Sequence, residues 1–357
     1  MTDHHGYIHR CLELAAKAKG LVAPNPMVGA VLVYNNTIIG EGFHERFGEE
    51  HAEVNCLKSV KENDRHLIPQ STMYVSLEPC AHYGKTPPCA LRLVQENIKQ
   101  VIVCNDDPFD NVNGKGFDIL RANDIVIQNG ILAKEGLWLN RRFFCFHQQK
   151  RPYIILKWAQ TQQGFFAPLN RSRFQMSNMH SQQLVHKWRT EEAAIFVGTK
   201  TALNDDPQLT ARLWKGTNPL RIVIDRRLEL PESLQLFNKD ATTWIINERK
   251  EESRDNKRYI QLDFGESVIK QLLQKLHEEN ILSLIVEGGA TLLRSFIDGN
   301  LWDEVRVFET ENILHEGIAA PLFSNANQAF SSQLGTDKLH VYVNKQSAYQ
   351  YVQEMEL

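Results

Sequence analysis

Long apolar runs are absent from the sequence. No segment of the 357 residues has the roughly 20 consecutive apolar residues that a helix needs to cross a bilayer. The N-terminal stretch MTDHHGYIHRCLELAAKAKG contains acidic residues and several histidines, unlike a signal peptide. These two absences lead us to expect a cytoplasmic protein without membrane contacts.

Basic residues are not in excess either. Lys and Arg together number 40 and Asp and Glu 43, which gives a formal net charge of -3. Proteins that bind nucleic acids or anionic membranes usually present a basic surface, so neither partner is expected. The expected ligand is a small molecule. A homo-oligomer is also expected, although no motif specifies its size.

Cysteine is scarce. The six cysteines are Cys11, Cys56, Cys80, Cys89, Cys104 and Cys145. They are too few for a disulfide scaffold of this length. Cys11 and Cys56 lie in helical apolar patterns and Cys104 ends the run VIVC, so these three are expected to be small buried hydrophobes. Cys80 and Cys89 have different surroundings.

The chain is longer than one hydrophobic core usually organises, so two domains are expected. In the first part, the helical pattern YIHRCLELAAKAKG should end at Gly20, and two strands should meet at a turn, Asn35–Asn36. After the polar segment FHQQKRP, buried-type strands such as PYIILKWA, AAIFVGT, LRIVID and LSLIVEGG begin a second pattern. The strands WDEVRVFET and LHVYVNK are expected to be antiparallel at the sheet edge. We predict two α/β domains, residues 1–145 and 153–357, joined by a linker of residues 146–152.

Candidate metal ligands occur in two segments, HAEVNCLKSV from His51 and EPCAHYGKTPPC from Glu78. His51 and Glu53 are expected to open one helix, and Cys80 and Cys89, each preceded by proline, to open two others. A thiol at a helix N-terminus ionises more easily because of the helix dipole. One imidazole and two thiolates form the Cys₂His set of a catalytic zinc site, which leaves one coordination position open for water.

Glu53 lies too close to His51 in sequence to be an obvious fourth ligand, but it could hold a proton beside the open position. H-x-E followed by P-C-x-x-C is typical of zinc nucleobase deaminases, in which the Glu acts as general acid and base. HAE and PC match this pattern, whereas the second cysteine is displaced to Cys89. The alternative is a closed structural site, for which His82 is the candidate fourth ligand. A lone histidine at a helix start is also more often a surface or core residue.

Four segments, PNPMVGAVLV, GEGFHERFGEEHAEVNCL, YVSLEPCAHYGKTPPC and NGKGFDILRANDIVI, resemble the deaminase half of a bifunctional deaminase/reductase family of riboflavin biosynthesis. The long spacing between the two cysteines is that family's own form. The resemblance implies a cytidine-deaminase-like fold and a zinc ion, with Glu53 as the catalytic residue. It further implies that four residues hold the base and phosphate: Asn25, His44, His82 and Lys85. Asn25 lies between two prolines and could equally be only a turn former.

The second half resembles the reductase half of the same family in FVGTKTALNDDPQLTAR, LRIVID and LIVEGGATLLRSFI. This resemblance implies a dihydrofolate-reductase-like α/β fold and NADPH as cofactor. VEGGATLL itself predicts a strand, a Gly-Gly turn and a helix start, where free N–H groups suit a phosphate, although many such turns bind nothing. No G-x-G-x-x-G motif occurs, which argues against a Rossmann fingerprint.

The reductase resemblance also implies binding positions. Those for NADPH are Ala159, Gln175, Thr201, Asp205, Gly288, Gly289, Ala290, Thr291 and Leu292. Those for the substrate are Lys157, Arg173, Arg189, Leu209, Arg212 and Glu287. Arginine suits a phosphate because its guanidinium can donate two parallel hydrogen bonds. The chain departs from the family at Gln163, where Asp is usual, and at Gln175, where Trp is usual.

Together these assignments predict a bifunctional enzyme. Zinc-dependent hydrolysis would deaminate 2,5-diamino-6-(5-phosphoribosylamino)pyrimidin-4-one. NADPH would then reduce the ribosyl chain to give 5-amino-6-(5-phosphoribitylamino)uracil. The alternative is a nucleoside or tRNA deaminase fused to a non-catalytic ligand-binding α/β domain. A tRNA deaminase should be more basic than this chain, and a non-catalytic zinc module would have no use for Glu53.

Overall fold

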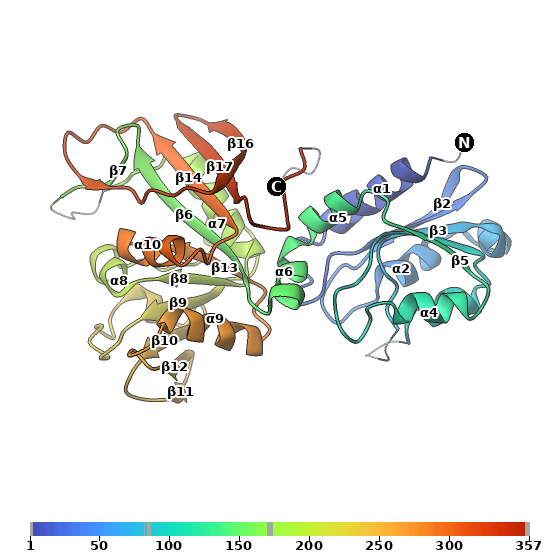
Figure 1. The fold of residues 1–357 in the computed structure, drawn as a ribbon, viewed down its shortest axis with the longest axis horizontal. Coiled ribbons are helices and arrows are strands. Elements are labelled where there is room, and N and C mark those ends of the chain that lie inside the picture. Colours follow the sequence, from blue (N-terminus) through green and yellow to red (C-terminus); the bar gives the residue numbers. More distant parts are fainter. Residues whose placement is uncertain (1–2, 82, 84–86, 170–173, 354–357) are drawn as a thin grey trace. The chain divides into compact units, whose positions relative to one another are not determined.

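The computed structural model describes residues 3–81, 83, 87–169 and 174–353. The chain divides into two compact units, one formed by Met1–Gln149 and Tyr351–Leu357 and the other by Lys150–Gln350 (Figure 1). Part of the predicted linker is regular structure, because α6 (Arg141–Gln149) runs as far as Gln149. The change from one unit to the other therefore comes directly after a helix.

The first unit is a five-stranded sheet with the order β2-β1-β3-β4-β5. The strands β2, β1 and β3 are antiparallel neighbours, whereas β3, β4 and β5 are parallel. The strands are β1 (Gly29–Tyr34), β2 (Thr37–Phe43), β3 (Thr72–Leu77), β4 (Gln100–Asn105) and β5 (Val126–Asn129). The helices besides α6 are α1 (His4–Ala16), α2 (Ala52–Ser59), the 3-10 helix η1 (Glu62–Gln70), α3 (Cys89–Gln95), α4 (Lys115–Arg121) and α5 (Ala133–Leu139).

Alternate side chains of these strands enter two different cores. Val75 and Val103 pack in one core with residues of α2, α3 and α4. Tyr74 and Ile102 pack in the other with residues of α1. Since successive strand residues point to opposite faces, the sheet is covered on both sides and is the middle one of three layers.

Two local predictions in the first unit have different outcomes. The turn between β1 and β2 is confirmed, because Asn35 and Asn36 have φ values of 46° and 60°, as a two-residue hairpin turn with two left-handed residues requires. The predicted end of the first helix is wrong. α1 ends at Ala16, and Gly20 belongs to a separate turn with φ 76°.

The second unit contains a ten-stranded sheet with the order β11-β12-β10-β9-β8-β13-β6-β14-β17-β16. Its strands are β6 (Tyr153–Thr161), β8 (Ala194–Val197), β9 (Leu220–Ile224), β10 (Thr243–Asn247), β11 (Glu252–Arg254), β12 (Lys257–Gln261), β13 (Ser283–Glu287), β14 (Glu304–Thr310), β16 (Ala326–Leu334) and β17 (Asp337–Asn344). A small separate sheet pairs β7 (Phe165–Ala167) with β15 (Ile318–Ala319). The helices are α7 (Met179–Glu191), α8 (Thr199–Asp205), η2 (Gln235–Phe237), α9 (Val268–Glu278) and α10 (Ala290–Asp298).

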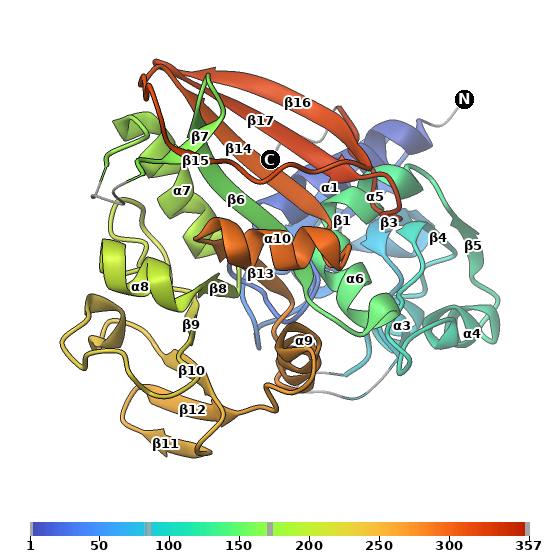
Figure 2. The same cartoon turned by 60° about the vertical axis from the view of Figure 1, so that its left-hand side comes forward.

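Helices cover both faces of this larger sheet (Figures 1 and 2). Leu272 of α9 and Phe296 of α10 share one core with Phe196 of β8. On the opposite face, Trp188 of α7 packs against Phe308 of β14, with ring centroids 5.5 Å apart. Strands β12, β10, β9, β8, β13, β6 and β14 are parallel, so their carboxyl ends share one edge, where ligands of α/β sheets usually bind.

The prediction for the C-terminal strands is partly wrong. β17 is antiparallel to β14, as expected, but β14 is also parallel to β6 and lies inside the sheet. The edge strand beyond β17 is β16, a polar strand of mostly exposed residues without a clear apolar pattern.

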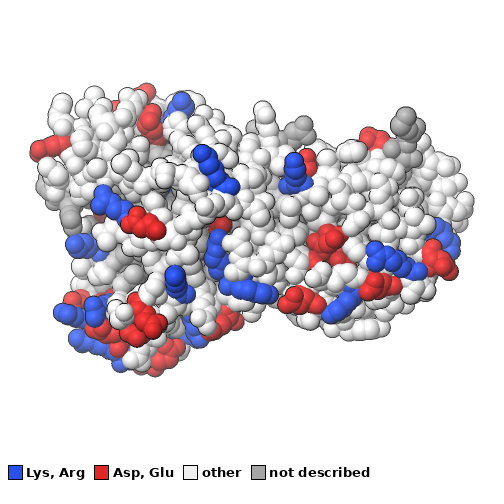
Figure 3. Space-filling model, viewed as in Figure 1, with Lys and Arg blue, Asp and Glu red and all other residues white. Residues whose placement is uncertain are grey.

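Charge is distributed without large regions of one sign on the face shown in Figure 3, where basic and acidic side chains are interspersed.

Among the described residues, no helix has the length and apolar character needed to span a bilayer.

Candidate active sites

The structure brings the three predicted metal ligands of the first unit together. His51 Nδ1 lies 3.5 Å from Cys80 Sγ and 3.4 Å from Cys89 Sγ, and all three donor atoms lie within 4.8 Å of one another. Ligand distances of about 2.0 Å for nitrogen and 2.3 Å for sulfur place tetrahedral N and S ligands of zinc about 3.6 Å apart. The donor set and its spacing therefore fit a zinc ion. Within the part of the chain that the structure describes, no other group of His, Cys, Asp and Glu has such an arrangement.

Each ligand is positioned by a different kind of backbone. His51 is the N-cap residue of α2 and Cys89 is the first residue of α3, both as predicted. The prediction that Cys80 opens a helix is wrong, because it lies in an irregular segment after β3. α2 approaches the sheet closely at Gly42, where an added Cβ would lie 2.3 Å from the backbone N of Cys56. Glycine in β2 thus permits the packing that carries His51 to the thiols.

The electrostatic surroundings prepare the cluster for a cation. Hydrogen bonds from Cys89 and His51 lower the pKa of Cys80 to about 4, although burial acts in the opposite direction. Glu53 lies in the first turn of α2 and is only 3% exposed. Burial, assisted by the nearby Cys80, raises the pKa of Glu53 to about 7. A carboxyl group with this pKa can both take up and release a proton near neutral pH.

Of the four residues predicted to hold the base and phosphate, the structure describes two. Asn25 Nδ2 lies 3.1 Å from His44 Nε2, and His44 Nδ1 lies 3.0 Å from the Glu50 carbonyl oxygen. Burial lowers the pKa of His44, so its neutral ring donates to Glu50 and accepts from Asn25. The ring of His44 also packs edge-on against His51, with centroids 5.2 Å apart. His82 and Lys85 lie outside the described residues, so the closed-site alternative with His82 stays a prediction.

In the second unit, a cavity of about 570 Å³ collects several predicted positions. Gln175 and Asp205, predicted for NADPH, and Arg189, Leu209 and Arg212, predicted for the substrate, all line it. This volume is in the range of small-molecule sites. The predicted substrate residue Arg173 lies outside the described residues.

A buried ion-pair cluster lies against this cavity. Arg189 Nη2 donates to Glu287 Oε2 at 3.0 Å, and Lys157 Nζ lies 3.9 Å from the same oxygen. Burial alone would raise the pKa of Glu287, but Arg189 and Lys157 outweigh it and lower that pKa. Glu287 Oε1 and Arg189 Nε are buried without a protein hydrogen-bond partner. These two atoms suit a ligand that both donates and accepts hydrogen bonds.

The predicted Gly-Gly turn follows β13. Gly288 has a φ of 139°, which side-chain-bearing residues rarely adopt, and Gly289 is the N-cap residue of α10. Thr201 Oγ1 accepts from Gly289 N at 2.8 Å, which joins α8 to this turn. Ala290, Thr291 and Leu292 form the first turn of α10, and Ala159 lies in β6. These positions are thus near the carboxyl ends of neighbouring strands, as a cofactor site at this edge requires.

Several residues near the reductase cavity were not predicted. It is also lined by Phe174, Asp206, Pro207, Gln208 and Gln235, and His186 accepts from Leu213 N at 3.4 Å. His186 precedes Arg189 by three residues on α7, so helical spacing could have indicated it. Gln235 belongs to a 3-10 helix far from any motif, and only the tertiary structure brings it to the site.

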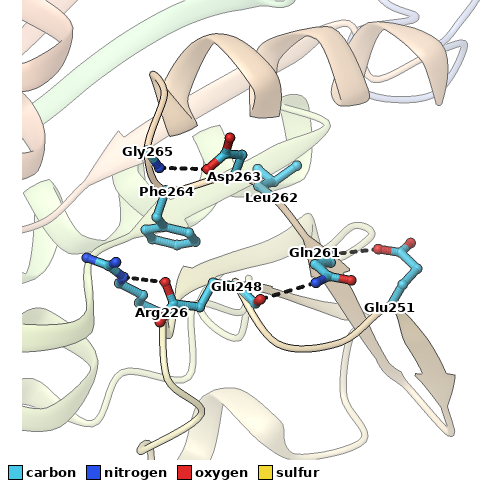
Figure 4. A pocket seen from close by; sticks show the side chains of 8 residues that line it. All are labelled: Arg226, Glu248, Glu251, Gln261, Leu262, Asp263, Phe264 and Gly265. Carbon is cyan, nitrogen blue, oxygen red and sulfur yellow. Dashed lines mark hydrogen bonds and ion pairs between the residues drawn. The ribbon is translucent and has the colours of Figure 1, made fainter.

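A second hollow, of about 720 Å³, lies beside the carboxyl ends of β9, β10 and β12 (Figure 4). Arg226 Nε donates to Glu248 at 2.7 Å, and its guanidinium lies 5.2 Å from the Phe264 ring centroid. Asp263 accepts from Gly265 N at 2.7 Å. The charged and polar groups of this hollow are therefore largely engaged with one another.

Comparison with known proteins assigns a family to each unit. The family of the cytidine and deoxycytidylate deaminase zinc-binding region matches residues 1–105, and the RibD C-terminal domain family matches residues 152–328. The riboflavin biosynthesis protein RibD of Aquifex aeolicus is 38% identical over 318 residues, which are 88% of either chain. This chain belongs to the RibD family.

Solved structures support the same assignment over both units. A diaminohydroxyphosphoribosylaminopyrimidine deaminase/5-amino-6-(5-phosphoribosylamino)uracil reductase from Thermotoga maritima has a TM-score of 0.87 and 31% identity, covering 96% of this chain and 98% of that chain. RibD of Acinetobacter baumannii has a TM-score of 0.86 and 30% identity, covering 95% and 98%.

Membership in the RibD family confirms the predicted fold class and overall activity. The chain is a bifunctional enzyme of riboflavin biosynthesis, with a cytidine-deaminase-like domain that binds zinc and a dihydrofolate-reductase-like domain that uses NADPH. The alternative of a deaminase fused to a non-catalytic domain is therefore set aside.

Proposed function

We propose that the first unit deaminates 2,5-diamino-6-(5-phosphoribosylamino)pyrimidin-4-one and that the second reduces the product to 5-amino-6-(5-phosphoribitylamino)uracil. The observation that carries the first step is the placement of one imidazole and two thiols beside the buried carboxyl of Glu53. The name of the Thermotoga maritima relative, which describes this deaminase and reductase pair, supports the choice of substrates.

His51, Cys80 and Cys89 would hold the zinc ion, which activates water as a nucleophile when it is bound. Glu53 takes the proton that water loses and delivers it to the departing amino group, so that water is consumed and ammonia released. Burial of Glu53 raises its pKa, which favours uptake of the proton that water loses. Asn25 and His44 lie beside the cluster and orient the pyrimidine, with His82 and Lys85 completing the base and phosphate contacts.

In the reductase, Lys157, Arg189, Leu209, Arg212 and Glu287 would hold the substrate, together with Arg173. Glu287 Oε1 and Arg189 Nε, buried without protein partners, supply one acceptor and one donor for it. Gln175, Asp205, Thr201 and Ala159 with the turn from Gly288 to Leu292 would hold NADPH. The cofactor supplies hydride to the first carbon of the opened sugar, and these residues orient the two partners.

Incubation of the protein with the diaminopyrimidinone phosphate, with and without NADPH, tests both steps by mass spectrometry of the products. We expect the deaminated compound without NADPH and the ribityl compound with it, and less product with NADH. Ammonia release without any ribityl product, although NADPH binds, would mean that Gln163 and Gln175 have inactivated the reductase. Absence of deamination would contradict the first assignment.

We also propose that residues 1–145 form a separable deaminase, residues 146–152 a connecting segment, and residues 153–357 the reductase. The near coincidence of the predicted boundary with the division at Gln149 and Lys150 supports this proposal. A fragment ending at Gln149 should be folded, loaded with zinc and active in ammonia release. A folded, zinc-loaded but inactive fragment would mean that the second unit completes the first site.

We further propose that the enzyme is a cytoplasmic homo-oligomer. The strand β16 lies at the edge of the ten-stranded sheet and is mostly exposed, so two copies could associate along this edge. Light scattering at several protein concentrations measures the oligomeric state, and a strictly monomeric protein would contradict the proposal. Cell fractionation tests the location.

A further inference from the structure

Glu78, the residue after β3, is a buried carboxylate, only 3% exposed, that is surrounded by backbone amides. Its two oxygens accept from four backbone N–H groups: Asp107 at 3.3 Å, Gly114 at 3.1 Å, Gly116 at 3.0 Å and Phe117 at 3.3 Å. Four acceptor positions are the full capacity of a carboxylate. The carboxylate therefore ties the end of β3 to the segment that leads into α4.

The contacts of Glu78 replace a missing helix cap. The N-cap residue of α4 is Gly114, with a left-handed φ of 83° and no side chain that could accept a hydrogen bond. The N–H groups of Gly116 and Phe117, at the second and third positions of the helix, are those that an N-cap side chain usually satisfies. Glu78 satisfies them from a different element, and its negative charge faces the positive end of the helix dipole.

The first turn of α4 lies directly against the backbone beside a zinc ligand. A Cβ added at Gly116 would lie 2.0 Å from the carbonyl oxygen of Pro79, and 3.0 Å from Glu78 Oε1. Pro79 is bonded to Cys80, whose own backbone belongs to an irregular segment. Cys80 is held on one side by the two residues before it and on the other by α3, since its carbonyl oxygen accepts from Ala90 N at 3.2 Å and its Sγ from Cys89 N at 3.3 Å.

We propose that Glu78 is a positioning residue for the metal site: by capping α4 it fixes Pro79 and thereby the thiolate of Cys80. The inference rests on the proposed zinc ligands. Outer residues that orient metal ligands typically contribute about 10–100-fold to metal affinity. The substitution Glu78→Gln should have an effect of this size, because the new amide NH₂ would face backbone donors instead of accepting from them.

The experiment uses the full chain with cobalt(II) in place of zinc, since the visible absorption of cobalt reports its thiolate ligands and their geometry. Glu78→Gln should change the cobalt absorption bands and weaken zinc binding by about 10–100-fold, measured against a chelator. Glu78→Asp, which keeps the charge on a shorter side chain, should restore part of both. Gly116→Ala keeps the carboxylate but presses on Pro79, and it should change the bands in the same way.

Asp3→Ala is the matched control. Asp3 also caps a helix of the first unit, by accepting from Gly6 N at 2.9 Å, but it lies on α1 away from the metal ligands in the chain. The Asp3→Ala variant should have a lower thermal stability and unchanged cobalt bands.

The inference would be overturned if the Glu78 and Gly116 variants lost thermal stability but kept the cobalt bands and the zinc affinity of the wild type. If Glu78→Gln and Gly116→Ala cannot be purified folded, Glu78→Asp decides: unchanged bands and affinity overturn the inference. A wild-type protein without cobalt–thiolate bands would instead refute the proposed zinc site itself.

Discussion

Each unit has a largely buried glutamate beside its candidate site, and the surroundings shift the pKa values of the two in opposite directions. Glu53 of the first unit lies near Cys80, Cys89 and His51, and burial raises its pKa to about 7. Glu287 of the second unit is also buried, but Arg189 and Lys157 lower its pKa. Burial alone therefore does not determine the direction in which the pKa of a carboxyl group shifts.

The difference matches the chemistry of each half. A deaminase needs a group that takes up and releases protons, and burial favours the protonated form of Glu53. In the reductase the hydride comes from the cofactor, so a carboxylate that stays charged, as the lowered pKa of Glu287 favours, is compatible with the proposed substrate-binding role. The substitution of each glutamate, and of the groups around it, tests this contrast.

The largest effect is expected from Cys89→Ser. Loss of one of three ligands should reduce zinc from one ion per chain to almost none and abolish ammonia release. NADPH-dependent reduction of the deaminated intermediate should persist. Zinc is measured by metal analysis, with Cys104→Ser, a buried cysteine outside the cluster, as the control. Full retention of zinc by Cys89→Ser would show that the ligands are wrongly assigned.

Glu53→Gln should reduce the rate of ammonia release by about 10²–10⁴-fold, the usual contribution of a general acid or base. Zinc content and the reductase rate should stay at the wild-type level, because the amide has nearly the same shape and no ligand is lost. Steady-state assays of both half-reactions measure this. Near-normal deamination would eliminate the proposed role of Glu53.

Glu287→Gln should destabilise the second unit by about 3–5 kcal/mol, the range found when one partner of a buried ion pair is removed. Arg189 and Lys157 would then be buried without their counter-charge. Chemical denaturation measures the change. Glu53→Gln is the matched control and should leave stability almost unchanged, since it removes no ion pair. Equal losses of stability in Glu287→Gln and Glu53→Gln would show that the ion pairs of Glu287 do not distinguish the two glutamates.

The smallest effect concerns pH. Burial, with Arg189 and Arg212, lowers the pKa of His186 to about 4, whereas an unfolded histidine has a pKa of about 6.5. Between these values the unfolded chain binds the proton and the folded chain does not. The second unit should therefore lose stability as the pH falls from about 6.5 towards 4, by at most about 3 kcal/mol from this group. His186→Gln should flatten the dependence in denaturation experiments, whereas His180→Gln, at an exposed position, should leave it unchanged.

The two sites also differ in how far sequence reasoning could predict them. His51, Glu53, Cys80 and Cys89 lie in two short segments, and their residue types alone specify a zinc site. The prediction that Cys80 opens a helix was wrong. The helix start near it is that of α4, whose N–H groups of Gly116 and Phe117 donate to Glu78, two residues before Cys80.

In the reductase, Phe174 and Gln235 were missed because neither stands in a motif, and the cavity that contains them is lined by residues from distant segments of the chain. The pairing of β14 was missed for a related reason. Polar alternation in its sequence suggested an edge strand, but β17 and β16 continue the sheet beyond it. Strand patterns specify which faces are covered and not which strands are neighbours.

The sequence by itself therefore predicted the two α/β folds, the set of metal ligands and a proton-transfer role for Glu53, because these predictions depend on residue type and on spacing along short segments. Only the tertiary structure decided the pKa of each buried glutamate, the cavity beside Arg189 and the capping of α4 by Glu78. These depend on groups that are distant in sequence, and the free energy of a buried charge is determined by whichever groups lie within a few ångströms of it.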